Sequence, residues 1–224
     1  MHVSIVIPII NEAGMIQACM ENLRALEGEF DVLFVDGGST DGTLDIIGSS
    51  YPLISCAKGR AKQMNEGASH TSGDVLLFLH CDSLLPKDAI KQIRVVLEEG
   101  YSFGCFRIAF DTRGFWMKCC AFLSNMRVRW RRIAFGDQGI FMTRLLFESI
   151  GGFPELPIME DYQLSLMLRG KVPLGQARGP LLTSGRRFED GGVLRTIWLM
   201  QCLQHRFRRG DDIHLISRLY QDIR

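Results

Sequence analysis

The feature that most constrains the fold is the regular alternation of short apolar segments with amphipathic ones in the first part of the chain. Four segments rich in β-branched and other apolar residues predict buried strands at 3–10, 31–35, 53–57 and 75–79. Helical spacing and capping residues predict helices over 11–26, up to Ile47, over 58–69 and over 87–99. This order of strands and helices predicts a parallel sheet with helices on both faces.

The second half of the chain is less regular. Apolar segments at 103–110 and 133–142 predict further strands, and helical spacing predicts helices over 115–131, 161–169 and 194–208. We expect a mixed sheet in this half. No repeat, linker or low-complexity segment interrupts the 224 residues, so we expect one α/β domain over residues 1–224.

Charge and composition argue against several classes of protein. The net charge of +1 gives no electrostatic reason to expect nucleic acid as a partner. The N-terminal MHVSIVIPIINE lacks the basic start of a signal peptide, and no apolar run approaches the ~18 residues of a membrane span. Seven cysteines, an odd number without a CxxC pair, are typical of a reduced protein, so we expect a cytoplasmic location.

Residues suited to binding a ligand follow each of the first four predicted strands. In chain order they are Pro8, Asn11 and Glu12, then Asp36 and Gly38, then Lys58 and Arg60, then His80 and Asp82. Ligands of open α/β sheets bind beyond the carboxyl ends of the strands. We therefore expect these residues to surround a single ligand site.

The residue types indicate what that ligand is. Lys58 and Arg60 suit phosphate oxygens, which an arginine binds with two parallel hydrogen bonds. Asp82 suits a hard cation, because Mg²⁺ commonly takes one or two carboxylates and leaves its other positions to water and substrate phosphates. His80 is either a second metal ligand or a hydrogen-bonding group that positions the site. We expect a nucleotide diphosphate together with Mg²⁺ or Mn²⁺.

Six motifs together resemble the family 2 glycosyltransferases of GT-A fold. They are 8-PIINE-12, 36-DGGSTDGT-43, 59-GRAKQMNEGA-68, 78-FLHCDSLLP-86, 136-GDQG-139 and 159-MEDYQL-164. The resemblance runs from about residue 3 to residue 190. Within the family, GRAKQMN, FGDQGIF and GGFPELPIMED look like the small transferases named for their association with radical-SAM and selenodomain proteins.

The resemblance implies a fold and a reaction. The fold would be a Rossmann-like three-layer α/β/α sandwich with a mostly parallel central sheet. Residues from about 1 to 100 would form its nucleotide-binding half, and residues from about 101 to 224 its acceptor-binding half. The reaction would move a sugar, with inversion, from a UDP- or GDP-linked donor to an acceptor hydroxyl, with the help of a divalent metal.

Residue roles follow from the matching motifs. The residues expected around the donor are Pro8, Asn11, Glu12, Asp36, Gly38, Lys58, Arg60, Gln138, Arg186 and Arg187. Asp82 matches the last acid of the family's Asp-x-Asp signature and would bind the metal, whereas the first acid of that signature is His80 here. Asp161 matches the general base, and Glu160 stands beside it as a second candidate catalytic acid.

Three other interpretations fit parts of the sequence. The run from Ser39 to Leu44 echoes haloacid dehalogenase phosphatases, but Ser39 stands where their aspartyl nucleophile would be. A nucleotidyltransferase shares the sheet architecture, but it usually has a basic glycine-rich loop where this chain has the acidic Asn11-Glu12. A non-catalytic nucleotide-sugar binding module remains an alternative because His80 replaces an acid, although Asp82 and Asp161 favour an enzyme.

Two basic segments that carry aromatic residues form a separate feature. Residues 112–136 include no acid, and arginines surround Trp130. Residues 194–209 repeat the pattern around Trp198. Basic helices with aromatic residues suit an anionic membrane surface, and a solvated cationic face fits the same pattern. In the first case the protein would lie at the inner face of the membrane, and the acceptor would be lipid-linked.

Overall fold

The computed structural model of the chain describes residues 1–112, 114–185, 188 and 191–221. Its strands are β1 (Val3–Ile9), β2 (Phe30–Asp36), β3 (Leu53–Ser55), β4 (Val75–Phe78), β5 (Ser83–Leu84), β6 (Phe103–Phe110), β7 (Ile140–Thr143) and β8 (Leu174–Thr183). Its helices are α1 (Ile16–Arg24), α2 (Thr43–Ile47), α3 (Arg60–Ser69), α4 (Ala89–Glu98), α5 (Phe115–Arg131), α6 (Arg144–Ser149), α7 (Glu160–Leu168), α9 (Val193–Arg209) and α10 (Ile213–Gln221), with a 3-10 turn η1 (Gly136–Gln138).

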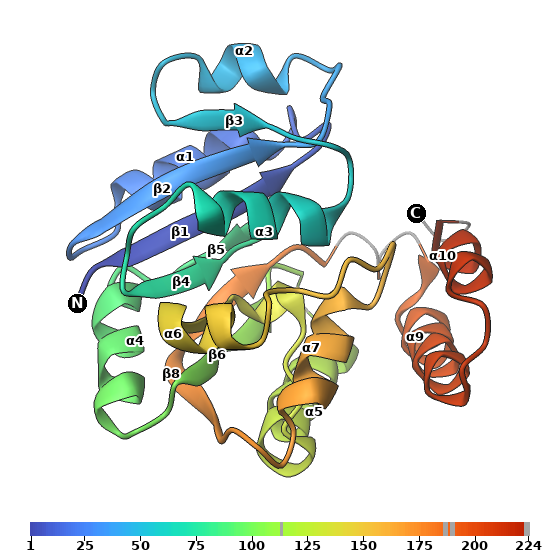
Figure 1. Cartoon of the computed structure of the whole chain (residues 1–224). Coiled ribbons are helices and arrows are strands. Elements are labelled where there is room, and N and C mark those ends of the chain that lie inside the picture. The colour runs from blue at the N-terminus through green and yellow to red at the C-terminus, as the bar shows by residue number, and fades with distance from the viewer. Residues whose placement is uncertain (113, 186–187, 189–190, 222–224) are drawn as a thin grey trace.

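The strands of the described residues form a single sheet in the order β3-β2-β1-β4-β7-β6-β8-β5 (Figure 1). The pairs β2–β3, β1–β2, β1–β4 and β6–β8 are parallel. Strand β7 runs antiparallel to both β4 and β6, and β5 runs antiparallel to β8. The mixed, mostly parallel sheet predicted from the sequence is confirmed.

The sheet is covered on both faces because its strands alternate their apolar side chains. In β1, Val3, Ile5, Ile7 and Ile9 pack into one core together with residues of α1, α2 and α4. Val6 points to the opposite face, into a second core that includes residues of α3, α5, α6 and α7. The predicted three-layer α/β/α arrangement is therefore confirmed.

Several element boundaries differ from those predicted. The first helix begins at Ile16 and not at residue 11, because residues 11–15 form the loop that leaves β1. The strand expected over 133–142 is wrong in its first half, where η1 turns the chain before β7 begins at Ile140. Sequence periodicity also missed β5, β8, α6 and α10, of which β8 carries glycines and a proline that weaken its strand pattern.

The last two helices pack on α7 through a small third core. Tyr162 of α7 meets Leu203 of α9 and Ile216 of α10 there, together with Ile133 and Met159. Figure 1 shows α9 and α10 side by side at the edge of the molecule. This core therefore connects the end of the chain to the helix that begins with Glu160 and Asp161.

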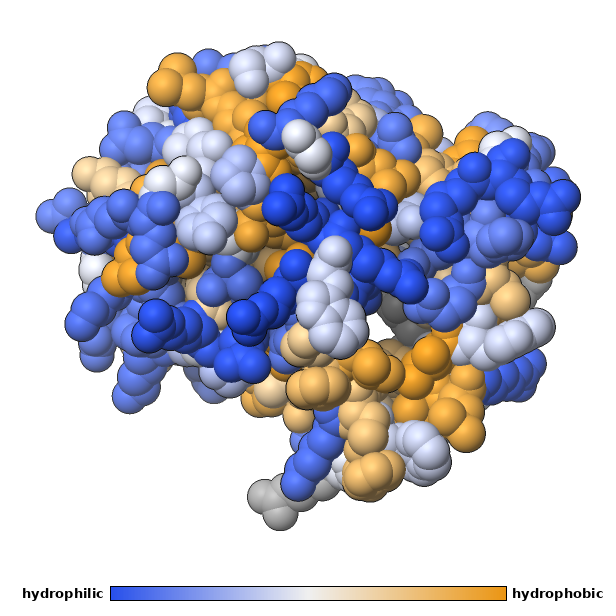
Figure 2. Space-filling model, turned by 90° about the horizontal axis from the view of Figure 1, so that it is seen from below, coloured by the Kyte–Doolittle hydropathy of each residue, from blue (hydrophilic) through white to orange (hydrophobic). Residues whose placement is uncertain are grey.

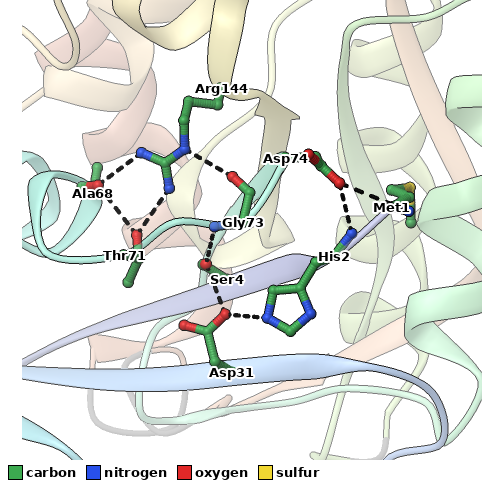
Figure 3. A network of polar contacts seen from close by, with 9 residues as sticks. All are labelled: Met1, His2, Ser4, Asp31, Ala68, Thr71, Gly73, Asp74 and Arg144. Atoms are coloured by element: carbon green, nitrogen blue, oxygen red, sulfur yellow. Dashed lines mark hydrogen bonds and ion pairs between the residues drawn. The ribbon is translucent and has the colours of Figure 1, made fainter.

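A polar network holds the loop that leads into β4 (Figure 3). The guanidinium of Arg144 donates from Nε to the carbonyl of Gly73 at 2.7 Å, from Nη1 to that of Ala68 at 2.9 Å and from Nη2 to the hydroxyl of Thr71 at 3.1 Å. Gly73 N in turn donates to Ser4 Oγ at 2.9 Å. Arg144 thereby ties the end of α3 and the starts of β1 and β4 together.

Candidate active site

The loops after β1 and β2 bind each other beyond the carboxyl ends of these strands. Asn11 N donates to Ser39 Oγ at 3.0 Å, and Thr40 N donates to Asn11 Oδ1 at 2.8 Å. Glu12 N donates to Thr43 Oγ1 at 2.8 Å. Asn11 has a φ of 54°, a left-handed conformation that asparagine tolerates better than most residues. The structure thus brings together the polar residues that follow the first two strands.

Asp36 shapes the second loop from within. Its carboxylate accepts hydrogen bonds from Gly38 N at 2.9 Å, Ser39 N at 3.0 Å and Ser39 Oγ at 2.6 Å. The residue is only 3% exposed. The carboxylate of Asp36, expected around the donor, is therefore already hydrogen-bonded within its own loop. Gly38 of the same loop is exposed at the surface.

Gln63 is a site residue that sequence reasoning missed. This buried side chain of α3 donates from Nε2 to the carbonyls of Ile9 and Val35, both at 2.8 Å. It therefore spaces the carboxyl ends of β1 and β2. A Cβ on Gly37 would lie 3.0 Å from the side chain of Gln63, so any larger residue there would have to displace that side chain. The available signal was a glutamine on the apolar face of the predicted helix.

Arg60 and Glu160 form an ion pair between the N-termini of α3 and α7. Glu160 is 1% exposed, and burial raises the pKa of its carboxyl while the charge of Arg60 opposes that rise. Burial lowers the pKa of the Arg60 guanidinium, but the charges of Glu160 and Asp161 outweigh burial and raise it overall. Glu160 is thus placed to hold Arg60, and its burial argues against the catalytic role expected from the sequence.

Asp161 is half-exposed and its carboxylate is fixed by two backbone donors. Gly136 N donates to Oδ2 and Tyr162 N donates to Oδ1, both at 2.7 Å. A Cβ on Gly136 would lie 2.6 Å from His80 Nε2 and 3.3 Å from Asp161 Oδ2. His80 and Asp161 therefore face the same small space, which stays open because residue 136 is a glycine.

The chain turns sharply just before Asp161. Met159 is buried and has a φ of 65°, a conformation that a non-glycine residue adopts only when its surroundings impose it. It packs in the third core with Tyr162 and Leu203. This packing fixes the direction in which α7 starts, and with it the position of Asp161.

Asp82 suits a metal ion that also binds the ligand. Its carboxylate is half-buried and, among the described residues, accepts one long hydrogen bond, from Ser83 Oγ at 3.3 Å. No group of three or more His, Cys, Asp or Glu side chains in the described part of the chain could hold a metal by itself. The donor set fits an ion such as Mg²⁺ that takes most of its oxygens from water and a diphosphate.

Gln138 and Arg127 lie elsewhere than the sequence suggested. Gln138 is fully buried, and its Oε1 accepts from Arg127 Nη2 at 2.8 Å and from Phe135 N at 3.3 Å. Arg127 also covers the ring of Phe135 at 4.1 Å from its centroid. The Oε1 of Gln138 is thus bound within the protein, and Arg127 lies on the inner side of α5 and not among its exposed basic residues.

The remaining predicted residues are spread around this centre. Pro8 is half-buried in β1, and Lys58 is exposed in the loop before α3. Arg186 and Arg187, expected to reach the diphosphate, lie outside the described residues.

Comparison with known proteins identifies the family. Residues 4–151 match the description of Glycosyl transferase family 2. The chain belongs to this family. A PGL/p-HBAD biosynthesis glycosyltransferase of Mycobacterium bovis is 35% identical to this family 2 member over 106 residues, which are 43% of the chain and 41% of that protein. A beta-monoglucosyldiacylglycerol synthase of Synechocystis is 25% identical over 192 residues, 75% of the chain and 40% of that protein.

The fold of this family 2 glycosyltransferase is that of known GT-A structures. A mannosyltransferase from Pyrobaculum calidifontis, solved with GDP-Man and Mn²⁺, superposes with a TM-score of 0.68 at 18% identity. The superposition covers 97% of this chain and 69% of that one. The chain spans about two fifths of the length of the two curated relatives named above.

Proposed function

We propose that this chain transfers a sugar, with inversion, from a nucleotide-diphosphate donor to an acceptor hydroxyl. The observation that carries the proposal is the pairing of Arg60 with Glu160 beside Asp161. Arg60 comes from the motif expected to bind the donor, and Asp161 from the motif expected to activate the acceptor. The ion pair joins the two halves, about 1–100 for the nucleotide and about 101–224 for the acceptor.

In the proposed reaction Asp161 is the general base. The acceptor oxygen attacks the anomeric carbon, its proton passes to the Asp161 carboxylate, and the bond from that carbon to the diphosphate oxygen breaks. The N–H groups of Gly136 and Tyr162 hold the carboxylate in place. Arg60, positioned by Glu160, offers positive charge to the departing nucleoside diphosphate.

A divalent ion, Mg²⁺ or Mn²⁺, would bind at Asp82 and neutralise charge on the diphosphate leaving group. His80 would be its second ligand or a hydrogen-bonding neighbour of Asp161. Asn11, Glu12, Pro8, Gly38 and Lys58 would line the donor site. The complex of the Pyrobaculum mannosyltransferase with GDP-Man and Mn²⁺ supports this ligand class for the fold.

We further place the chain among the radical-SAM and selenodomain-associated transferases. Two of the motifs that support this subgroup contact each other: Asn65 of GRAKQMN donates to the Phe153 carbonyl at 2.9 Å and accepts from Phe153 N at 2.8 Å.

The acceptor we propose is lipid-linked. The name of the Synechocystis relative, a diacylglycerol glycolipid synthase, supports that class.

The direct test is thermal stabilisation by UDP, GDP, CMP and ADP, each with and without Mn²⁺ or Mg²⁺. A ligand that binds only the folded protein at about 100 times its Kd adds roughly 2.7 kcal/mol, which a melting curve resolves. We expect one diphosphate to raise Tm when metal is present, and Asp82→Ala to abolish the metal-dependent part of the shift.

The matched control is Glu29→Ala, which removes an exposed carboxylate just before β2, at the opposite end of that strand from the loop of Asp36. It should leave the shift unchanged. Metal-dependent binding without turnover on any acceptor would favour a non-catalytic binding module. Release of pyrophosphate from a nucleoside triphosphate would favour a nucleotidyltransferase.

A further inference from the structure

A pocket lies between β6, β8 and α5, and it is lined by none of the residues described above for the candidate active site. It has a volume of about 200 Å³ and is lined by Arg107, Asn125, Met126, Arg129, Gln176 and Arg178. A register shift creates it. Phe106 pairs with Ala177 but Arg107 pairs with Pro180, so Arg178 and Gly179 bulge out of the ladder. The bulge lets Arg107 and Arg178 line one pocket from neighbouring strands.

The pocket is built to receive negative charge. Arg107, Arg129 and Arg178 are exposed, no carboxylate lines the pocket, and none of the three forms an ion pair within the described part of the chain. The amide nitrogen of Gln176 is buried without a hydrogen-bond partner among the described residues. An unpaired buried donor is costly unless a ligand accepts from it. Three guanidinium groups and this amide match the oxygens of a phosphate group.

Asn125 supports the wall of the pocket. Ile108 N donates to its Oδ1 at 2.8 Å, and its Nδ2 donates to the Ile108 carbonyl at 3.1 Å. These two bonds fix the position of α5 relative to β6 beside Arg107. Arg129 follows Asn125 by one helical turn, so it lies on the same side of α5 and lines the pocket together with Arg107.

The same helix exposes an apolar surface. Trp116, Leu123 and Trp130 recur every seven residues and so share one stripe of α5, with exposures of 54%, 61% and 74%. Phe115 and Phe122 lie on the next stripe, with exposures of 72% and 60%, in line with Arg129. Figure 2, which shows the molecule from the side on which α5 lies in Figure 1, has hydrophobic surface in the lower part of the view and also at its upper left. Exposed apolar groups in such number on one element mark an interaction surface.

We infer that α5 and this pocket form a site for anionic lipid, with a headgroup phosphate held by Arg107, Arg129 and Arg178. The aromatic stripes would lie in the interfacial layer of the bilayer, as amphipathic helices rich in Trp, Phe and Arg do. The charge of the pocket is complementary to an anionic membrane surface. No helix among the described residues is long and apolar enough to cross a membrane.

The inner side of α5 contacts the 3-10 turn η1, which in turn binds Asp161 of the candidate active site. Arg127 binds Gln138 at 2.8 Å, and Gly136, two residues earlier, donates to Asp161. Lipid binding does not depend on the proposed transfer reaction. If both hold, the membrane surface brings a lipid-linked acceptor to the side of the molecule on which Asp161 lies.

The test is co-sedimentation of the full chain at low salt with vesicles of phosphatidylcholine alone or mixed with phosphatidylglycerol. We expect binding to the mixed vesicles only. Arg107→Gln with Arg178→Gln should lower the partition coefficient roughly thirtyfold, because each basic side chain near an anionic surface contributes about fivefold. Trp116→Ser with Trp130→Ser should also lower the partition coefficient, because it removes two exposed aromatic side chains that would enter the bilayer interface. Both side chains are exposed, so the fold should stay intact, and circular dichroism would verify this.

The matched control is Lys87→Gln with Lys91→Gln, which removes the same charge at α4, on the opposite face of the sheet. It should change the partition less than twofold. An equal loss in this control, or no binding of the wild type to mixed vesicles, would overturn the inference. So would a Tm shift by inorganic phosphate that depends on Arg107 and Arg178 without vesicle binding, since the pocket would then serve a free phosphate.

Discussion

At the scale of single residues, the candidate site depends on groups that hold other groups in place. Glu160 holds Arg60, and the backbone of Gly136 holds Asp161. Gly136 also gives His80 room, because a Cβ there would lie 2.6 Å from Nε2 of that ring. These contacts place Asp161 beside His80, and the ion pair holds Arg60 next to Glu160, the residue before Asp161.

The first prediction concerns Asp161. In Asp161→Asn the side chain cannot take the acceptor proton, and its amide nitrogen cannot accept one of the two backbone hydrogen bonds that hold the carboxylate, so turnover should fall by at least roughly 10²–10⁴-fold. Donor binding should stay near the wild-type value, because the loops after β1 and β2 are untouched. Steady-state rates and nucleotide titrations would measure the two effects separately. Glu155→Gln, an exposed acid in the loop before α7, is the control. Turnover within a few-fold of the wild type would assign the base to another residue.

At the scale of the elements, a polar network fixes the start of β4. Arg144 at the beginning of α6 donates to the carbonyl of Ala68 in the last turn of α3, and to Thr71 and Gly73 in the segment between α3 and β4. Gly73 N in turn donates to Ser4 of β1, so the segment is held by α6 and β1 together. The position of β4, and so of His80 and Asp82 at its other end, depends on this anchor.

The second prediction follows from that anchor. Arg144→Gln loses charged hydrogen bonds to partly buried acceptors, so the free energy of unfolding should fall by about 2–3 kcal/mol. Urea denaturation would show a lower midpoint at an unchanged slope. Arg94→Gln, an exposed arginine of α4 beside the same segment, should have little effect. Equal midpoints for the two variants would contradict the role given to Arg144.

At the scale of the whole molecule, the C-terminal helices α9 and α10 support the candidate site by packing against α7. Leu203 of α9 and Ile216 of α10 pack against Tyr162 and Met159, the residues on either side of Glu160 and Asp161. The two larger cores, which hold β1 to β4, include no residue of α9 or α10. Loosening α9 should therefore disturb the proposed acceptor half more than the proposed nucleotide half.

The third prediction tests this division. Leu203 is 1% exposed, and Leu203→Ala should destabilise its core by about 2–5 kcal/mol. Hydrogen exchange should quicken in α7, α9 and α10 but not in β1 to β4, and turnover should fall while nucleotide binding is kept. Leu194→Ala on the exposed side of α9 serves as the control. Faster exchange throughout the sheet would mean that the chain opens as one unit.

The order of strands and helices from β1 to β4, and the placement of Asp36, His80 and Asp82 at strand ends, could be predicted from the sequence alone. These features follow from local periodicity, because a segment that alternates or repeats its apolar residues shows which side it buries. The family motifs are likewise short and contiguous. Strand β8 escaped prediction because its glycines and proline obscure that local signal.

Which polar groups satisfy one another depends on the tertiary structure and could not be predicted from the sequence. Arg60 and Glu160 meet because β7 inserts antiparallel beside β4, which brings the second half of the chain over the carboxyl ends of the first. For the same reason Gln138, expected around the donor, and Arg127, from the basic segment 112–136, bind each other inside the molecule. Nothing local encodes such pairs, since a buried charge or amide is stable only with its partner, and the partner is set by the path of the whole chain.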